Sequence, residues 1–84
     1  MPLQEVYNMV RAYIMVKAYT GEADRLKTDI TDIDGVERAH IVAGDVDIIA
    51  VVDVGSPAEV KDVAATHVQD IDGVEDTQTY IAMD

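Results

Sequence analysis

A short internal repeat constrains the fold of this chain more than any other feature. The sequence Ile-Asp-Gly-Val-Glu occupies residues 33–37 and again residues 71–75. Each copy follows a segment with helical apolar spacing and precedes an alternating segment, so the chain contains two copies of one supersecondary unit. Two copies are too few for a solenoid, which needs at least about three repeats. With 84 residues in total, the two units must share a single small core.

The segment before the first repeat predicts a strand over residues 10–19. One face of this strand carries only aliphatic residues, namely Val10, Ala12, Ile14, Val16 and Ala18. Strict alternation of this kind is typical of a half-buried strand. The other face carries Arg11, Tyr13, Met15, Lys17 and Tyr19. This face is too apolar for open solvent and too polar for a core, so it favours contact with a partner surface.

Two helices are predicted from their start and stop signals. The first helix spans about residues 21–33, with Thr20 as its cap and Gly35 as the left-handed residue that ends it. The second begins at Ser56-Pro57-Ala58-Glu59, a capping box around a proline at the first helical position. Its buried stripe is predicted to consist of Val60, Val63, Ala64, Val68 and Ile71, and Gly73 ends it.

The remaining segments complete a βαββαβ order. Strands are predicted over residues 36–43 and 46–54, joined by a hairpin turn at Gly44-Asp45, and over residues 74–83. Right-handed crossovers interleave the two halves into an α+β, ferredoxin-like fold, in which a four-stranded antiparallel sheet carries both helices on one face. Residues 1–9 then form an N-terminal extension, and residues 10–84 form the domain.

This fold leaves the second face of the sheet uncovered. Tyr13, Met15, Ile49 and Val51 are predicted to lie on it and to form an exposed apolar patch. Because such a patch usually marks an interface in a small domain, we expect two subunits to pair sheet to sheet in a dimeric α/β-barrel-type assembly. These four residues are the predicted dimer interface.

The charge balance excludes several classes of function. Seventeen acidic residues stand against six basic ones, for a net charge of −11, and such a surface repels nucleic acid phosphates. Most of the acidic residues are Asp. This favours a protein from a high-salt organism over the alternative that the charge only keeps the chain soluble. The sequence has no Cys, no apolar run long enough for a bilayer and no signal peptide pattern. We therefore expect a cytoplasmic protein that does not contact membranes.

Few residues suggest chemistry. His40 and His67 share no metal-ligand spacing, so no metal site, catalytic residue or cofactor is predicted. Asp45 and Asp47 flank Val46 and form either a pair of carboxylates for acid–base chemistry or a polar turn. Both interpretations stay open at this point.

Several short motifs, taken in order, resemble one known family. They are the strand Val-Arg-Ala-Tyr-Ile-Met-Val, the sequence Asp-Gly-Val-Glu, a strand closing on Ala-Gly-Asp-Val-Asp-Ile, a helix opening with Ser-Pro-Ala-Glu, and Asp-Gly-Val before a Thr-rich last strand. Over residues 10–84 the chain resembles the effector-binding domain of the Lrp/AsnC family of regulators. Only residues 1–9 precede this region, so the resemblance is to a stand-alone form without a helix-turn-helix.

The resemblance implies a ligand and a site. Family members pair sheet to sheet, often assemble further, and bind a small effector, usually an amino acid, between dimers. Their Gly-x-x-Asp signature corresponds to Gly44 and Asp47, in the turn that also holds Asp45, and a Thr of their last strand corresponds to Thr77 or Thr79. Val46 stands where the family usually has an aromatic residue.

The resemblance also implies a role. We expect a non-enzymatic module of transcription regulation that forms a homodimer or higher oligomer, binds an amino acid or similar small effector, and joins full-length Lrp/AsnC regulators in mixed oligomers. Two alternatives remain: a small dimeric α/β-barrel enzyme of the monooxygenase type, and a purely structural interaction module.

Overall fold

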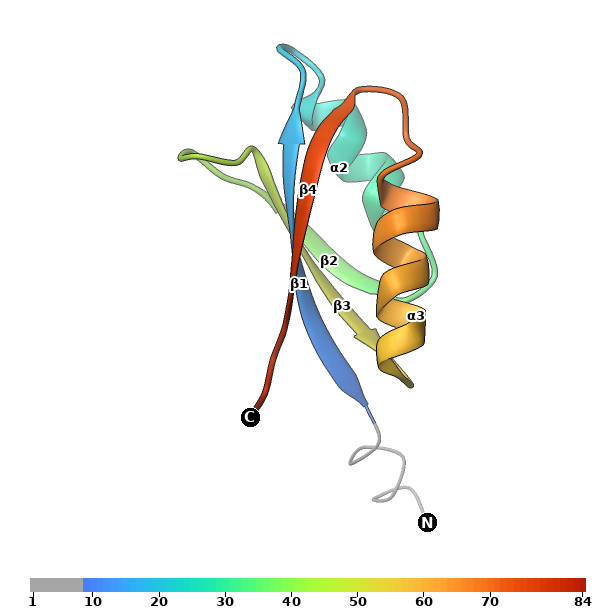
Figure 1. The fold of residues 1–84 in the computed structure, drawn as a ribbon. Coiled ribbons are helices and arrows are strands. Elements are labelled where there is room, and N and C mark those ends of the chain that lie inside the picture. Colours follow the sequence, from blue (N-terminus) through green and yellow to red (C-terminus); the bar gives the residue numbers. More distant parts are fainter. Residues whose placement is uncertain (1–8) are drawn as a thin grey trace.

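The computed structural model describes residues 9–84 and has the predicted βαββαβ order (Figure 1). The elements are β1 (Val10–Ala18), α2 (Ala23–Thr31), β2 (Val36–Ile41), β3 (Ile48–Val54), α3 (Pro57–Lys61), its continuation η1 (Asp62–Val68), and β4 (Val74–Ile81). The predicted N-terminal extension lies outside the described residues except for Met9. Within residues 9–84, no helix has both the length and the apolar character that crossing a bilayer requires.

The four strands form one antiparallel sheet in the order β2-β3-β1-β4. Both helices cover the same face of this sheet, and β4 lies beside the second helix (Figure 1). The ferredoxin-like prediction is therefore confirmed. We call the uncovered side the outer sheet face.

The core lies between the sheet and the helices and is entirely aliphatic. Strand β1 contributes the predicted alternate positions, because Ala12, Ile14 and Val16 are all fully buried. The other members are Leu26, Ile30, Ala39, Ile48, Ala50, Val52, Val60, Val63, Ala64 and Val68. No polar or charged residue among those described is buried. Hydrophobic burial of small branched side chains therefore holds the two halves together.

Helix α2 begins two residues later than predicted. Gly21 adopts a left-handed backbone (φ +84°) in a turn where the N–H of Glu22 donates to the carbonyl of Tyr19. Glu22, not Thr20, is therefore the N-cap residue, and its side chain makes no capping hydrogen bond. The helix also ends two residues earlier than predicted, at Thr31, and Gly35, which has the expected left-handed φ of +96°, lies in the following turn, where the N–H of Val36 donates to the carbonyl of Ile33.

The second helix begins as predicted and then widens. Ser56 accepts a hydrogen bond from the N–H of Glu59 at 3.3 Å, and Pro57 is the first helical residue. From Asp62 the helix continues as a π-helix, in which the N–H of Gln69 donates to the carbonyl of Ala64 five residues earlier. The apolar spacing did not distinguish this wider turn from a regular helix.

The predicted hairpin turn at Gly44-Asp45 is wrong in extent. Strand β2 ends at Ile41 and β3 starts at Ile48, so residues 42–47 form a longer loop that projects away from the helices (Figure 1). The N–H of Asp47 donates to the carbonyl of Val16 at 3.0 Å, and its carboxylate accepts from the N–H of Ala18 at 2.8 Å. Asp47 thus binds the end of β1 with its side chain, an alternative to strand pairing that Asp offers readily.

Candidate functional site

The four residues predicted for the dimer interface lie together at the centre of the outer sheet face. Tyr13 pairs with Val51, and Met15 pairs with Ile49, across the two central strands β1 and β3. Val51 is only 5% exposed, yet it does not belong to the core under the helices. Tyr13, Met15 and Ile49 are half-buried. The structure therefore brings these residues into one apolar patch, while their burial by a second subunit stays a prediction.

Polar and amphipathic side chains surround this apolar patch on the two edge strands. On β4, Tyr80 pairs with Tyr13 and Gln78 pairs with Met15, and the Tyr80 hydroxyl donates to Oε1 of Gln78 at 3.1 Å. On β2, Arg38 and His40 lie opposite Val51 and Ile49. An apolar centre with a polar rim is the usual composition of a protein interface.

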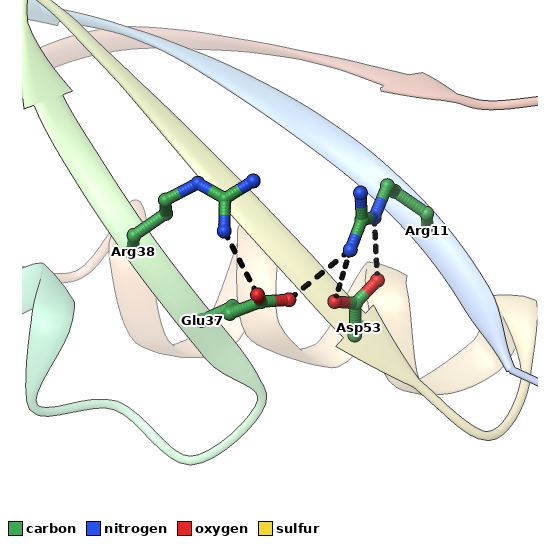
Figure 2. Close-up of polar contacts among 4 residues, drawn as sticks. All are labelled: Arg11, Glu37, Arg38 and Asp53. Atoms are coloured by element: carbon green, nitrogen blue, oxygen red, sulfur yellow. Dashed lines mark hydrogen bonds and ion pairs between the residues drawn. The ribbon is translucent and has the colours of Figure 1, made fainter.

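An ion-pair network crosses one end of the outer sheet face (Figure 2). Arg11 on β1 donates from Nε and Nη2 to the two carboxylate oxygens of Asp53 on β3, each at 2.8 Å. The same Nη2 reaches Oε2 of Glu37 at 3.2 Å, and Arg38 donates to Oε1 of Glu37 at 2.8 Å. Glu37 lies at a register shift between Val36 and Arg38 of β2. Three strands are thus connected by four charged side chains.

The network fixes the ionisation of Asp53. Its two hydrogen bonds from Arg11 lower the pKa of Asp53 from 3.8 to about 2. The same contact with Asp53 raises the pKa of Arg11 above its ordinary value. Arg11 and Asp53 are therefore both charged at neutral pH, and each compensates the charge of the other.

The charged residues that the strand register places on the outer sheet face balance one another. At the end of the outer sheet face away from Arg11, Lys17 on β1 lies opposite Asp76 on β4. The basic residues of this face are Arg11, Lys17 and Arg38, and the acidic ones are Glu37, Asp53 and Asp76. On the paired strands of this face, three positive charges thus stand against three negative ones, in a chain whose net charge is −11.

The predicted ligand residues of the β2–β3 loop have different surroundings. Asp45 is exposed, whereas Asp47 is half-buried and hydrogen-bonded to the end of β1. A Cβ atom added at Gly44 would meet nothing within 4 Å, so the space beside the loop is open. The loop offers carboxylates and accessible backbone, the groups that an amino acid needs for its ammonium and carboxylate.

Thr77 and Thr79 lie elsewhere, in a groove between β4 and the second helix. Thr77 pairs with Val16 from the side opposite to Asp47, so the loop and β4 reach the same residue of β1 from its two sides. The Thr77 hydroxyl donates to Oε1 of Gln69 at 2.8 Å. The groove has a volume of about 370 Å³ and is lined by Pro57, Val60, Lys61, Ala64, Ala65, Gln69, Thr77, Thr79 and Ile81. The sequence did not reveal this groove, because it depends on how the helix packs beside β4.

The two histidines do not form a site. His67 lies on the second helix, with Nε2 3.5 Å from a carboxylate oxygen of Asp62, whereas His40 lies on β2 at the edge of the sheet. The part of the chain that the structure describes contains no group of three or more His, Cys, Asp or Glu residues placed to hold a metal ion.

Solved structures show where else this fold occurs. TTHA0845 from Thermus thermophilus superposes with a TM-score of 0.85 at 24% identity, over 89% of this chain and 94% of that one. Escherichia coli AsnC superposes with a TM-score of 0.85 at 21% identity, over 100% of this chain and 56% of AsnC. A third match is the regulator NMB0573 from Neisseria meningitidis, which was solved as a complex with L-Met. It superposes with a TM-score of 0.81 at 14% identity, over 96% of this chain and 54% of that one. At these identities the likeness shows the fold.

The sequence itself gives the family. No curated protein matches the chain significantly, but residues 11–84 match the family model of the Lrp/AsnC ligand binding domain. Because that match spans β1 to β4 and the fold agrees with it, the chain belongs to the Lrp/AsnC ligand-binding domain family.

Proposed function

We propose that this chain is a non-enzymatic regulatory module that self-associates through the outer sheet face and binds an amino acid at the loop of residues 42–47. The observation that carries the first part is the apolar patch at the centre of the outer sheet face, flanked by three basic and three acidic residues in a chain of net charge −11. Two copies that approached through any strongly acidic surface would repel each other. The outer sheet face offers an approach without that repulsion, and it buries Tyr13, Met15 and Ile49.

The loop suits an amino acid for chemical reasons. Asp47 uses Oδ2 to hold the end of β1, so its other oxygen, Oδ1, can accept a hydrogen bond from a ligand ammonium group. The open space at Gly44 lets a ligand carboxylate approach the backbone, and Asp45 adds a second exposed acid. The complex of NMB0573 with L-Met supports an amino acid as the effector class. The shape of the loop, together with Val46, then determines which amino-acid side chain the site accepts.

An enzyme of the monooxygenase type receives less support from the geometry. Such an enzyme would need polar or titratable groups in the space between the sheet and the helices. In residues 9–84 that space is filled by aliphatic side chains, and none of the described polar or charged residues is buried. We therefore propose regulation by binding, in which a full-length Lrp/AsnC partner contacts the DNA and this acidic module joins it through the outer sheet face.

A thermal-shift screen tests the ligand. The chain is melted in concentrated potassium chloride with each of the twenty amino acids, because a ligand of the native state raises the melting temperature by mass action. We expect one amino acid or a small group of them to raise it. If none does, the effector proposal fails and a structural interaction module becomes the better account.

Two matched variants then locate the binding. Asp47→Asn keeps an oxygen that can accept from Ala18, so the fold should persist while binding weakens by about 1.5–3 kcal/mol, the scale of a hydrogen bond to a charged group. Asp32→Asn, on the exposed end of α2, removes the same charge away from the loop and should bind like wild type. Equal affinities for all three proteins would show that the loop is not the site.

A further inference from the structure

The repeated sequence Ile-Asp-Gly-Val-Glu forms two turns with the same backbone contacts. In the first turn the N–H of Val36 donates to the carbonyl of Ile33 at 3.1 Å, and in the second the N–H of Val74 donates to the carbonyl of Ile71 at 3.2 Å. The glycine of each turn has a positive φ, as the third residue of a type II turn requires. The central peptide of each turn is thus an Asp-Gly peptide between identical neighbours.

A side chain holds the central peptide of the second turn only. Arg25 on α2 donates from Nη2 to the carbonyl of Asp72 at 2.7 Å, and Glu22 fixes the same guanidinium by accepting from Nε and Nη2. No described residue donates a hydrogen bond to the carbonyl of Asp34. Arg25 lies three residues after the N-cap of α2, whereas the third residue after the N-cap of α3 is Glu59, whose carboxylate accepts hydrogen bonds. The first turn therefore lacks the donor that the second turn has.

An Asp-Gly peptide can rearrange with water as the only co-reactant. The glycine nitrogen attacks the side-chain carboxyl carbon of the aspartate and loses its proton, and a carboxyl oxygen leaves as water, which gives a five-membered succinimide. Water then breaks one of the two ring bonds to nitrogen. Breaking the new bond restores aspartate, whereas breaking the original peptide bond leaves isoaspartate, in which the main chain runs through the former side chain. Nothing is oxidised or reduced.

The attack requires the peptide group between the two residues to rotate, because the glycine nitrogen must turn towards the carboxyl carbon. The rotation carries the aspartate carbonyl with it. In the second turn this movement breaks the hydrogen bond from Arg25, whereas the carbonyl of Asp34 has no described hydrogen bond to lose. Neither Gly35 nor Gly73 donates its N–H to a described residue. We infer that Asp34 is a site of isoaspartate formation in the folded protein, and that Arg25 protects Asp72 against the same reaction.

The modification would act on the start of strand β2. Isoaspartate at position 34 adds one carbon to the main chain directly before this strand. Gly35 accepts a hydrogen bond from the N–H of Asp53 on β3 at 2.9 Å, and Glu37 accepts one from Arg11 on β1 at 3.2 Å. Both contacts depend on the length of the main chain that leads into β2. The reaction should therefore loosen this edge strand from the rest of the sheet.

Ageing of the folded protein tests the inference, and the two turns are matched because their five residues are identical. The protein is incubated for weeks in concentrated potassium chloride at mildly acid pH. Mass spectrometry with electron-transfer fragmentation then measures isoaspartate in the peptides that contain each turn. We expect about tenfold more at Asp34 than at Asp72, the lower end of the effect of a charge-assisted hydrogen bond. In urea, where the contact with Arg25 is absent, both positions should react at one rate. Equal amounts in the folded protein, or more at Asp72, would overturn the inference.

A matched pair of variants tests the protection by Arg25. In Arg25→Met, once circular dichroism has shown that the variant folds, isoaspartate at Asp72 should rise to the level of Asp34, and Asp34 should react as in wild type. Lys27→Met removes the same charge from an exposed position of α2 and should change neither rate. If Asp72 reacts no faster in Arg25→Met than in wild type, Arg25 does not protect it. The comparison of the two turns within wild type decides independently of how well the variant folds.

Amide hydrogen exchange of fresh and aged protein tests the loosening of β2. Exchange at Asp53 and in residues 36–41 should become faster in proportion to the isoaspartate found at Asp34, while exchange in the buried part of β1 stays unchanged. Conversion of Asp34 without faster exchange in β2 would contradict the effect on this strand.

Discussion

Replacing Arg11 by Met tests how the charged network stabilises the sheet. The change keeps an unbranched side chain of similar reach and removes the guanidinium that holds Asp53 with two hydrogen bonds of 2.8 Å. Without it, the pKa of Asp53 should return from about 2 towards 3.8. The difference corresponds to at most about 2 kcal/mol of preference for the ionised form. Because water and salt reach the exposed side of Arg11, we expect a loss of about 1 kcal/mol in the free energy of unfolding.

The pH dependence follows from the direction of the Asp53 shift. A carboxyl group whose pKa is lowered by folding stabilises the native state fully above its unfolded value of 3.8, and this contribution is lost as the pH falls through about 2. The difference in stability between wild type and Arg11→Met should therefore be constant from about pH 5 to neutrality and should disappear in strong acid.

Denaturant unfolding at fixed salt and protein concentration measures the free energies, and the carboxyl carbon resonance of Asp53 reports its pKa. Lys27→Met is the control, because it removes the same charge from the exposed surface of α2. The reasoning is refuted if Arg11→Met is no less stable than Lys27→Met, or if Asp53 titrates at the same pH in Arg11→Met and in wild type.

Two further predictions concern surface charge and backbone. The melting temperature should rise strongly from millimolar to molar salt, because a Debye length of roughly 3 Å at 1 M screens the repulsion among the acidic residues; a flat response would contradict an adaptation to high salt. Gly35→Ala should lower the unfolding free energy by about 1–3 kcal/mol, since Gly35 has φ +96° and its new Cβ would lie 2.8 Å from Cγ1 of Val54. Gly21→Ala shares the positive φ but meets nothing within 4 Å, so in unfolding experiments it should be the milder change.

The fold was predictable because its signals are local and occur twice. The repeated Ile-Asp-Gly-Val-Glu places a left-handed glycine after each helix, and both Gly35 and Gly73 have positive φ in the structure. Alternation in β1 predicted which side chains enter the core, and Ala12, Ile14 and Val16 are buried as expected. Each of these features depends on a few neighbouring residues, so the sequence is sufficient to reveal them.

The network and the groove depend instead on residues far apart in the chain. The contact between Arg11 and Asp53 requires the exact register of β1 against β3, and that with Glu37 requires the irregular pairing of β2. The loop of residues 42–47 is longer than turn propensities predict, because Asp47 binds Ala18 through its side chain, a long-range contact that such propensities do not contain. The π-helix likewise widens a segment whose apolar spacing also fits an α-helix.

Light scattering on a matched pair of variants tests self-association through the outer sheet face most directly. Met15→Lys places a charge at the centre of that face, whereas Met83→Lys makes the same substitution at a residue that is 93% exposed beyond the end of β4. At high salt we predict a dimer or larger assembly for wild type and for Met83→Lys, and a folded monomer or aggregates for Met15→Lys. A monomeric wild type, or a Met15→Lys variant with the same molar mass as wild type, would contradict the proposal.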